Sequence, residues 1–531
     1  MLVDSFDYVI VGAGSAGCVL ANRLSSTGKT VCVLEAGPED KSPLIHIPMG
    51  IIGLIREGCH NWGYNTEPEA HLNNRRLYWP RGKTLGGSSS INAMVYIRGT
   101  PADYNQWEAQ GNKGWGWNDL FPIFKALENN ERAANSWHGQ GGELNVADVR
   151  SINPLATRFV NAAAEVGLPI NDDFNGETQT GLGYYQVTQK EGMRFSSAKA
   201  FLTPVKQRSN LTILTETHVK RIVIESKRAV GVEVISKGQS RIIHAHSEVL
   251  LCGGAVNSPQ LLLLSGIGPR TELEKLGIPV IHDLAGVGKN LQDHLDITVM
   301  IRDKSKQSVG ISLFALPRVF VDVFRFIFQR RGLLTSNIAE SGGFIQMSDD
   351  PEGRPNIQLH FLPTFLRDHG RKLTMGHGCT IHLCQLRPKS RGEIRLSSTD
   401  PLAAPQILAN YLSHPDDLSV LVEGFKRARQ IFKTKSFAEV NDGEVFPGEQ
   451  VRSDEQIIAF IKENAETIYH PVGTCKMGHD DMAVVNDQLC VHGIASLRIA
   501  DASIMPTLVS GNTNAPCMVI AEKCFRMMGL S

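Results

Sequence analysis

The most constraining feature of the sequence lies near its start, where an apolar stretch runs directly into closely spaced glycines. Residues 7–11 have the composition of a buried strand, Gly12, Gly14 and Gly17 follow in a G-x-G-x-x-G pattern, and a second strand ends at Glu35. These glycines permit a sharp turn, close approach of a diphosphate and tight helix packing, while the acidic residue accepts hydrogen bonds from a ribose. The pattern predicts a Rossmann-like unit with a bound dinucleotide, FAD or NAD; a turn without a ligand is the simpler alternative.

Length and charge limit the architecture and the class of partner. A chain of 531 residues is too long for one ordinary hydrophobic core, and the lack of a linker-like segment predicts two domains that interleave along the sequence. The formal net charge is +0 and no long basic run is present, so nucleic-acid binding has no electrostatic basis. The first strand begins at Asp7 and leaves no room for a secretory signal, so we expect a cytoplasmic protein.

Cysteine and histidine lack the clustering that a metal site needs. The ten cysteines form no C-x-x-C pair, and we expect most of them to be reduced core residues. His360 and His382 lie on segments that alternate as half-buried strands do, so we interpret them as parts of a wall or a core. The sequence therefore predicts no bound metal.

Four further motifs follow the first in a fixed order, and together they resemble one family. Residues 81–89 read Arg-Gly-Lys-Thr-Leu-Gly-Gly-Ser-Ser, and the other matching stretches are residues 253–268, 287–294 and, near the C-terminus, 469–475 with 501–506. With the glycine motif, they resemble the glucose-methanol-choline (GMC) family of FAD oxidoreductases nearly end to end. Residues 90–99 and 339–344 bring the chain closest to the FAD-dependent alcohol dehydrogenases of bacterial alkane oxidation, with choline dehydrogenase next.

The resemblance implies an α/β protein, α+β overall, in which a Rossmann-like FAD-binding domain is interleaved with a substrate-binding domain built on an antiparallel sheet. We expect the FAD-binding domain to comprise residues 1–150, with 40–80 as a lid or loop region, residues 206–310, and residues 461–531, which carry the catalytic residues. The substrate-binding domain is expected to comprise residues 151–205 and 311–460.

The resemblance also implies the residues that hold FAD. They are Gly12, Gly14, Ser15, Ala16, Gly17, Glu35, Ala36, Leu85, Gly87, Ser88, Asn92, Ala93, Met94, Val95, Val219, Ala255, Asp501, Ala502 and Thr513. In the family, Asn92 would lie against the flavin ring, the backbone of Val219 would meet the adenine, and Asp501 would serve the diphosphate and the ribityl chain. Some relatives link the flavin to a histidine just before the position of Asn92. This chain has Ile91 there, so we predict a non-covalent FAD.

Oxidation of an alcohol needs one group that accepts the hydroxyl proton and another that holds the oxygen. Imidazole suits the first task near neutral pH, and His470, before Pro471, matches the catalytic histidine of the family. Asn512 matches the second catalytic position, where choline-oxidising relatives carry asparagine and many oxidases carry histidine. An amide donates a hydrogen bond without competing for the proton. Asn514 is the alternative assignment, and turn geometry is the simpler interpretation of Asn512.

The predicted reaction is the FAD-dependent oxidation of a primary, aliphatic alcohol to an aldehyde, by proton abstraction and hydride transfer to the flavin. Choline dehydrogenase is the first alternative, although the sequence reveals no aromatic or acidic cage for a quaternary cation. A flavin-containing lyase and a non-enzymatic flavin-binding protein are further alternatives. The electron acceptor is left open between a quinone, oxygen and another acceptor.

One predicted helix, at residues 313–328, is apolar over most of its surface. Arg318, Asp322 and Arg325 recur at helical spacing, and aromatic and aliphatic residues fill the remainder. Burial, a substrate entrance and a contact with the inner face of a membrane are three interpretations that the sequence leaves open. The helix is too short to span a bilayer.

Overall fold

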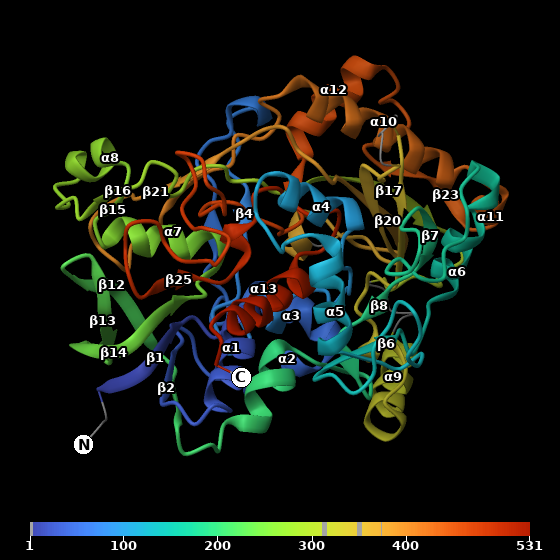
Figure 1. The fold of residues 1–531 in the computed structure, drawn as a ribbon. Helices are drawn as coiled ribbons and strands as arrows, with labels where there is room; N and C mark the ends of the chain where they lie inside the picture. The colour runs from blue at the N-terminus through green and yellow to red at the C-terminus, as the bar shows by residue number, and fades with distance from the viewer. Residues whose placement is uncertain (1–3, 311–315, 348–352, 373, 531) are drawn as a thin grey trace.

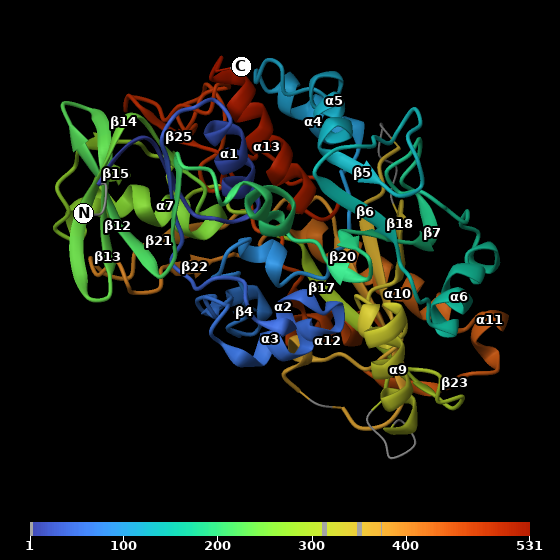
Figure 2. The same cartoon turned by 90° about the horizontal axis from the view of Figure 1, so that it is seen from below.

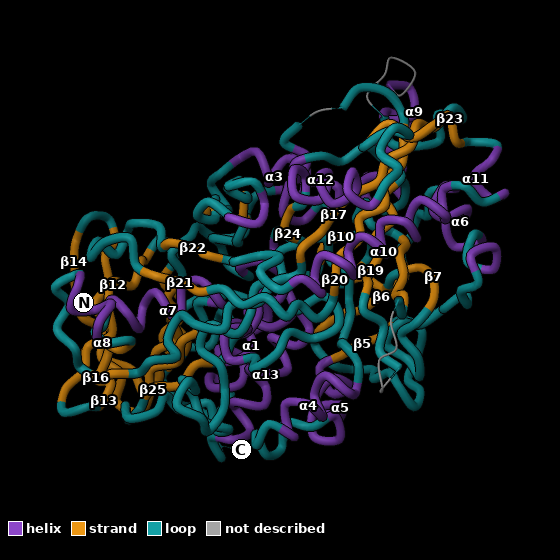
Figure 3. Tube along the Cα trace, turned by 90° about the horizontal axis from the view of Figure 1, so that it is seen from above, coloured by secondary structure: helices purple, strands orange, loops and turns teal. Residues whose placement is uncertain are grey.

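Two seven-stranded sheets organise the computed structural model, which describes residues 4–310, 316–347, 353–372 and 374–530. The first sheet lies on the left in Figure 1 and the second on the right. The view from above separates the same two groups of strands (Figure 3). This arrangement confirms the expected fold class, a nucleotide-binding α/β sheet combined with a second, antiparallel sheet.

The first sheet is the predicted Rossmann-like unit. Its strands follow the order β11 (Leu211–Leu214), β2 (Val31–Leu34), β1 (Ser5–Val11), β14 (Gln239–Leu251), β13 (Arg228–Ser236) and β12 (Thr217–Glu225), with β25 (Leu497–Ile499) paired to β14. The pairs among β11, β2, β1, β14 and β25 are parallel, whereas β12, β13 and β14 are antiparallel. Val9, Ile10 and Val33 are fully buried, as expected of parallel strands that are covered on both faces.

The turn after β1 requires its glycines. Gly12 has a φ of +102°, and a Cβ there would lie 2.5 Å from the carbonyl oxygen of Cys252. A Cβ on Gly17 would lie 1.9 Å from the carbonyl oxygen of Gly12. Side chains at these two positions are therefore excluded, because the helix and the strand approach too closely to accommodate them.

The second sheet is antiparallel and follows the order β23 (Asn441–Phe446), β17 (Leu295–Asp303), β20 (Gly378–Gln385), β19 (Ile357–Leu362), β18 (Ser341–Ile345) and β7 (Gly181–Tyr184), with β24 (Glu466–Thr467) paired to β17. Two strands from segments that we expected in the FAD-binding domain pair in this sheet: β17, which begins at Leu295, and β24, within residues 461–531. Residues 287–294, just before β17, are largely buried and do not read as a linker. The expected domain boundaries stay a prediction.

Helices cover the sheets and connect them. In chain order they are α1 (Ser15–Ser25), α2 (Pro43–His46), α3 (Ile51–Glu57), α4 (Pro101–Ala109), α5 (Trp117–Leu127), α6 (Pro154–Asn161), α7 (Gly254–Leu264), α8 (Arg270–Lys275), α9 (Leu316–Gln329), α10 (Pro415–Phe432), α11 (Lys435–Ala438), α12 (Asp454–Asn464) and α13 (Asn514–Met527). The helices α1 and α13 lie side by side between the sheets (Figure 2), and Arg23 Nε is 2.7 Å from Glu522 Oε2. The two ends of the chain thus build one side of the nucleotide-binding unit.

Short strands complete the fold. They are β3 (Tyr64–Asn65), β4 (Tyr78–Trp79), β5 (Glu128–Asn130), β6 (Leu144–Asp148), β8 (Gln186–Val187), β9 (Gln189–Lys190), β10 (Met193–Arg194), β15 (Ile267–Gly268), β16 (His282–Asp283), β21 (Glu393–Arg395) and β22 (Gln406–Leu408). Residues 40–80, expected as a lid or loop region, contain only short elements: α2, α3, β3, β4 and two 3-10 turns.

Candidate active site

A long cavity joins the glycine turn of the first sheet to the second sheet. It measures about 2610 Å³ with its open mouth included. All but two of the predicted cofactor residues line it, the exceptions being Gly17 and Leu85. Leu85 packs into the hydrophobic core of the first sheet, and Gly17 acts through the close contact with Gly12 described above.

The end of the cavity at the first sheet fits an adenosine diphosphate. A Cβ on Gly14 would have its nearest neighbour at 4.0 Å, so the backbone at the start of α1 is open to a diphosphate. Glu35 accepts hydrogen bonds from the backbone nitrogens of Ala13 at 3.0 Å and Gly37 at 2.9 Å, and burial raises its pKa to about 7. A carboxylate has about four acceptor sites, so both oxygens keep capacity for ribose hydroxyls.

Buried polar side chains hold two further parts of the predicted FAD site. Arg194 donates to the backbone and side-chain oxygens of Asn92 at 2.6 and 2.8 Å, and burial lowers its pKa to about 9. Asp501 accepts from the backbone nitrogen of Gly254 at 2.8 Å and from Ser258 Oγ at 2.6 Å. The carboxylate of Asp501 therefore ties the end of β25 to the start of α7, beside the cavity.

The two predicted catalytic side chains meet in the cavity wall. Asn512 Nδ2 lies 3.1 Å from His470 Nε2, although the two residues lie in separate loops. Asn514, the alternative assignment, accepts a hydrogen bond from Ser15 Oγ at 2.7 Å and so secures the start of α1. The geometry favours Asn512 over Asn514 as the partner of the histidine.

A chain of hydrogen bonds assigns the protons of His470. The carbonyl oxygen of Leu386 lies 2.9 Å from His294 Nε2 and can only accept, so this nitrogen carries a hydrogen. The His294 Nδ1, 3.0 Å from His470 Nδ1, is then the acceptor in a neutral ring. We infer that His470 is protonated on Nδ1 and presents a lone pair on Nε2.

Burial keeps both rings neutral. It lowers the pKa of His294 to about 3. Burial, followed by the neighbouring His294, His360 and Arg81, holds the pKa of His470 well below its ordinary value. A neutral imidazole with a free Nε2 is the state that a general base requires.

The backbone before His470 is held in an unusual conformation. Tyr469 has a φ of +74°, which is uncommon for a residue with a side chain. The Arg81 Nη2 donates to the Tyr469 carbonyl oxygen at 2.7 Å, and the His470 backbone nitrogen donates to Asp293 Oδ1, also at 2.7 Å. These bonds fix the direction in which the imidazole points.

A second side chain that the sequence did not reveal orients the amide. Gln358 Nε2 donates to Asn512 Oδ1 at 3.1 Å, so the NH₂ group of Asn512 faces His470. Gln358 gave no signal in the sequence. His294 ends the motif at residues 287–294, so its position was visible while its role was not.

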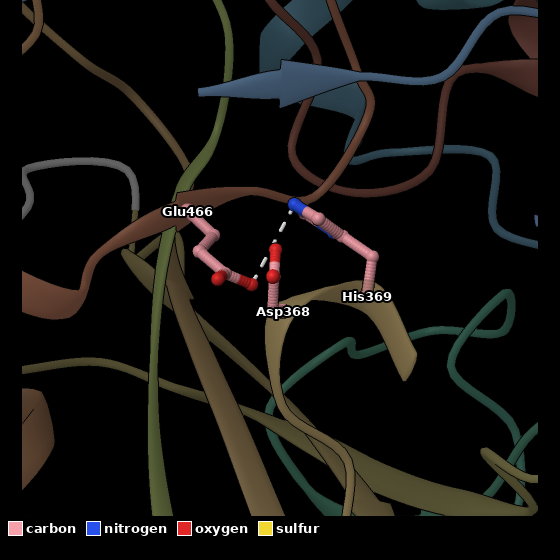
Figure 4. A group of neighbouring side chains, drawn as sticks. All are labelled: Asp368, His369 and Glu466. Atoms are coloured by element: carbon pink, nitrogen blue, oxygen red, sulfur yellow. Dashed lines mark ion pairs between the residues drawn. The ribbon is translucent and has the colours of Figure 1, made fainter. Parts of the chain in front are cut away.

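Three potential ligand side chains gather where His369 and Glu466 line another part of the cavity, with Asp368 beside them. Figure 4 shows Asp368, His369 and Glu466 pointing toward one another, with His369 Nε2 3.6 Å from Glu466 Oε2. Burial raises the pKa of Glu466 to about 7 and lowers that of His369 to about 3. Asp368 also pairs with Arg371 at 2.5 Å, and His369 contacts the Tyr469 hydroxyl. The absence of a metal stays a prediction.

The nucleotide-binding sheet, the long cavity and the neutral imidazole beside an amide define a dinucleotide-dependent oxidoreductase. The sequence model of the GMC oxidoreductase family matches residues 6–296, and its C-terminal counterpart matches residues 388–521. The chain belongs to the GMC oxidoreductase family, whose cofactor is FAD.

Relatives and solved structures are similar to this protein over nearly its whole chain. An alcohol dehydrogenase (acceptor) of Pseudomonas putida is 54% identical over 521 residues, which are 97% of this chain and 94% of that protein. Mitochondrial choline dehydrogenase of Homo sapiens is 42% identical over 98% of this chain and 89% of that protein. The crystal structure of formate oxidase has a TM-score of 0.92 at 30% identity, covering 99% of this chain and 98% of that chain. Pyridoxine 4-oxidase from Mesorbium loti has a TM-score of 0.87 at 31% identity, with 98% of each chain covered.

Proposed function

We propose that the protein oxidises primary, aliphatic alcohols to aldehydes. The observation that carries the proposal is the 3.1 Å approach of Asn512 Nδ2 to His470 Nε2 on the wall of the FAD cavity. Apolar side chains also line this cavity and suit an alkyl chain, namely Ile51, Ile52, Leu54, Ile338, Leu362 and Leu366. The name of the Pseudomonas putida relative supports the same activity.

The two side chains divide the work on the alcohol hydroxyl. Asn512 Nδ2 donates a hydrogen bond to the alcohol oxygen, and His470 Nε2 accepts the hydroxyl proton. The O–H electrons form the carbonyl bond as the carbon-bound hydrogen departs with its electron pair. FAD, when bound, supplies the acceptor of that hydride.

The proposal extends to the mode of FAD binding and to the electron acceptor. We propose that FAD binds non-covalently, because Ile91, which lines the cavity, has no nucleophilic atom to join to the flavin. We propose a quinone or a similar compound as electron acceptor, with oxygen as the alternative. A cytoplasmic location, at or near the inner face of a membrane, stays a prediction.

Choline oxidation is a second candidate, because the structure contains acidic side chains that the sequence did not place. Asp296 and Glu466 both line the cavity, where carboxylates attract a quaternary ammonium group. Asp296 is already paired with His382, however, at 2.6 Å. This pairing leaves Glu466 as the better candidate, because the His369 ring 3.6 Å away is kept neutral by burial, which lowers its pKa to about 3.

Anaerobic bleaching of the bound FAD tests the proposal. Wild-type protein is mixed with octanol or with choline, and the rate of loss of the flavin absorbance is followed for wild type, His470→Ala and Asn512→Ala. We expect octanol to bleach the wild type faster than choline does. His470→Ala should slow bleaching by about 10²- to 10⁴-fold with FAD content retained. Bleaching of His470→Ala at nearly the wild-type rate, or no bleaching of wild type by any alcohol, refutes the proposal.

A further inference from the structure

The helix α9 exposes the side chains that a soluble helix normally buries. Phe320, Phe324 and Phe328 are 76%, 59% and 69% exposed, and Ile327 is 58% exposed. Within the part of α9 whose side chains are described, residues 320–329, only Asp322 and Phe326 are buried. A helix covered by its own protein shows the reverse pattern. Of the three sequence interpretations, burial is therefore wrong for residues 320–329.

The exposed face is continuous and projects away from the molecule. Phe324 and Phe328 are one helical turn apart with ring centroids 4.4 Å apart, and Val321 and Val323 are exposed beside them. The helix stands out at the lower right of Figure 1, below β6. Arg318 and the start of the predicted helix, residues 313–315, lie outside the described side chains and residues. Contiguous apolar surface of this kind marks a binding site.

The surroundings of α9 are predominantly basic. Arg325, Arg330 and Arg331 are exposed on and just after the helix. Arg150 approaches the same turn, since its Nη1 lies 3.3 Å from the Arg330 carbonyl oxygen. Aromatic side chains bordered by arginines complement the acyl chains and anionic headgroups of a lipid leaflet. A second copy of this chain would bring like charges together.

The anchored side of α9 leads to the cavity. The 3-10 turn at Leu333–Thr335 contacts α9 and also the turn at Pro48–Gly50. The turn at Pro48–Gly50 runs directly into α3, whose Ile51 and Ile52 line the cavity. Ile338, just after the turn at Leu333–Thr335, also lines the cavity. The exposed helix therefore belongs to the same structural unit as one rim of the substrate cavity.

We propose that α9 docks on an anionic lipid bilayer, inserting Phe320, Phe324 and Phe328 among the acyl chains while the arginines meet the headgroups. No helix among the described residues is long and apolar enough to cross a membrane, so the contact is peripheral. Docking turns the adjacent cavity rim toward the bilayer, where apolar alcohols concentrate. The link between docking and access of alcohols to the cavity rests on the proposed function, whereas the docking itself does not.

Co-sedimentation with lipid vesicles tests the docking. Full-length, FAD-loaded protein is mixed with phosphatidylcholine vesicles that contain or lack phosphatidylglycerol. We expect binding that is stronger with the anionic lipid and weaker at high salt. Phe324→Ser/Phe328→Ser should lower the partition coefficient by at least about tenfold. Ile327→Ser should lower it less, and Ile170→Ser, at a side chain of matched exposure (53%) in a segment that pairs with β7, should leave it unchanged.

Three results overturn the docking proposal. They are failure of the wild type to bind anionic vesicles, equal binding by the double variant, and a concentration-dependent dimer in light scattering that the double variant dissolves. The last would assign the face to a second copy of the chain. None of these results depends on catalysis, so the docking can fail or hold independently of the proposed activity.

Turnover separates docking from chemistry. Oxidation of hexanol with a soluble dye as acceptor should be the same in wild type and Phe324→Ser/Phe328→Ser, because none of the described α9 side chains, residues 320–329, lines the cavity. Oxidation of decanol supplied in anionic vesicles should fall in the double variant in proportion to its lost binding. Unchanged turnover of decanol in vesicles would overturn the link between the docked helix and the cavity rim.

Discussion

The proton assignment of His470 depends on His294, and replacing His294 tests it. In His294→Phe an aromatic ring of similar size fills the site. The variant lacks the His294 Nδ1, which in the native protein lies 3.0 Å from His470 Nδ1 and accepts its hydrogen. A buried donor without a partner costs about 1–3 kcal/mol. The His470 imidazole can avoid that cost by carrying its proton on Nε2 instead of Nδ1. A proton on Nε2 blocks the position that must receive the substrate proton.

The same free energy sets the expected loss of rate. A penalty of about 1–3 kcal/mol corresponds to a 5- to 150-fold slower reduction of the flavin. His294→Asn is the matched control, because its amide oxygen can accept from His470 Nδ1, and it should remain within about threefold of wild type.

Anaerobic stopped-flow reduction by hexanol is the appropriate assay, because it isolates proton and hydride transfer from reoxidation. FAD content and the melting temperature are measured on each variant to exclude loss of the cofactor or of the fold. If His294→Phe retains FAD and is reduced as fast as wild type, His294 does not set the tautomer of His470. Equal losses in His294→Phe and His294→Asn would point to packing instead.

Two more predictions concern the same site. In Gln358→Leu, Asn512 loses the donor that orients its amide, so flavin reduction should slow by roughly tenfold while FAD stays bound; unchanged rates would show that the amide needs no orientation. The pKa of His470 lies well below its ordinary value, so the base is already neutral at pH 6.5. The reduction rate should therefore be flat from about pH 8 to pH 6.5 and fall only below that, and an inflection near pH 7 or above in a pH series would refute the depressed pKa.

The nucleotide-binding unit could be predicted because its determinants are local. Gly12 and Gly17 meet within one turn of strand and helix, and the apolar run of β1 shows burial without knowledge of its neighbours. The place of β17 in the second sheet was not predicted, for the opposite reason. Which sheet β17 joins depends on pairing with β20, and that information is spread over the chain.

The supporting residues of the site follow the same logic. His294 contacts His470 across 176 positions, and Gln358 contacts Asn512 across 154. Such contacts depend on the register of the second sheet and on how it faces the first, which no single motif encodes. The helix α9 is intermediate: its periodicity predicted a helix, but only the fold showed that few side chains of its described part, residues 320–329, are covered.

The nucleotide-binding unit is finished by the end of the chain. β25 pairs with β14, and Asn514 at the start of α13 accepts a hydrogen bond from Ser15, 499 positions earlier. Synthesis proceeds from the N-terminus. The glycine turn at residues 12–17 is therefore made early, but its sheet and the neighbouring helices are complete only when residues 497–527 have been added. We therefore expect the FAD site to be complete only after residues 497–527 have been synthesised and have folded against the N-terminal segment.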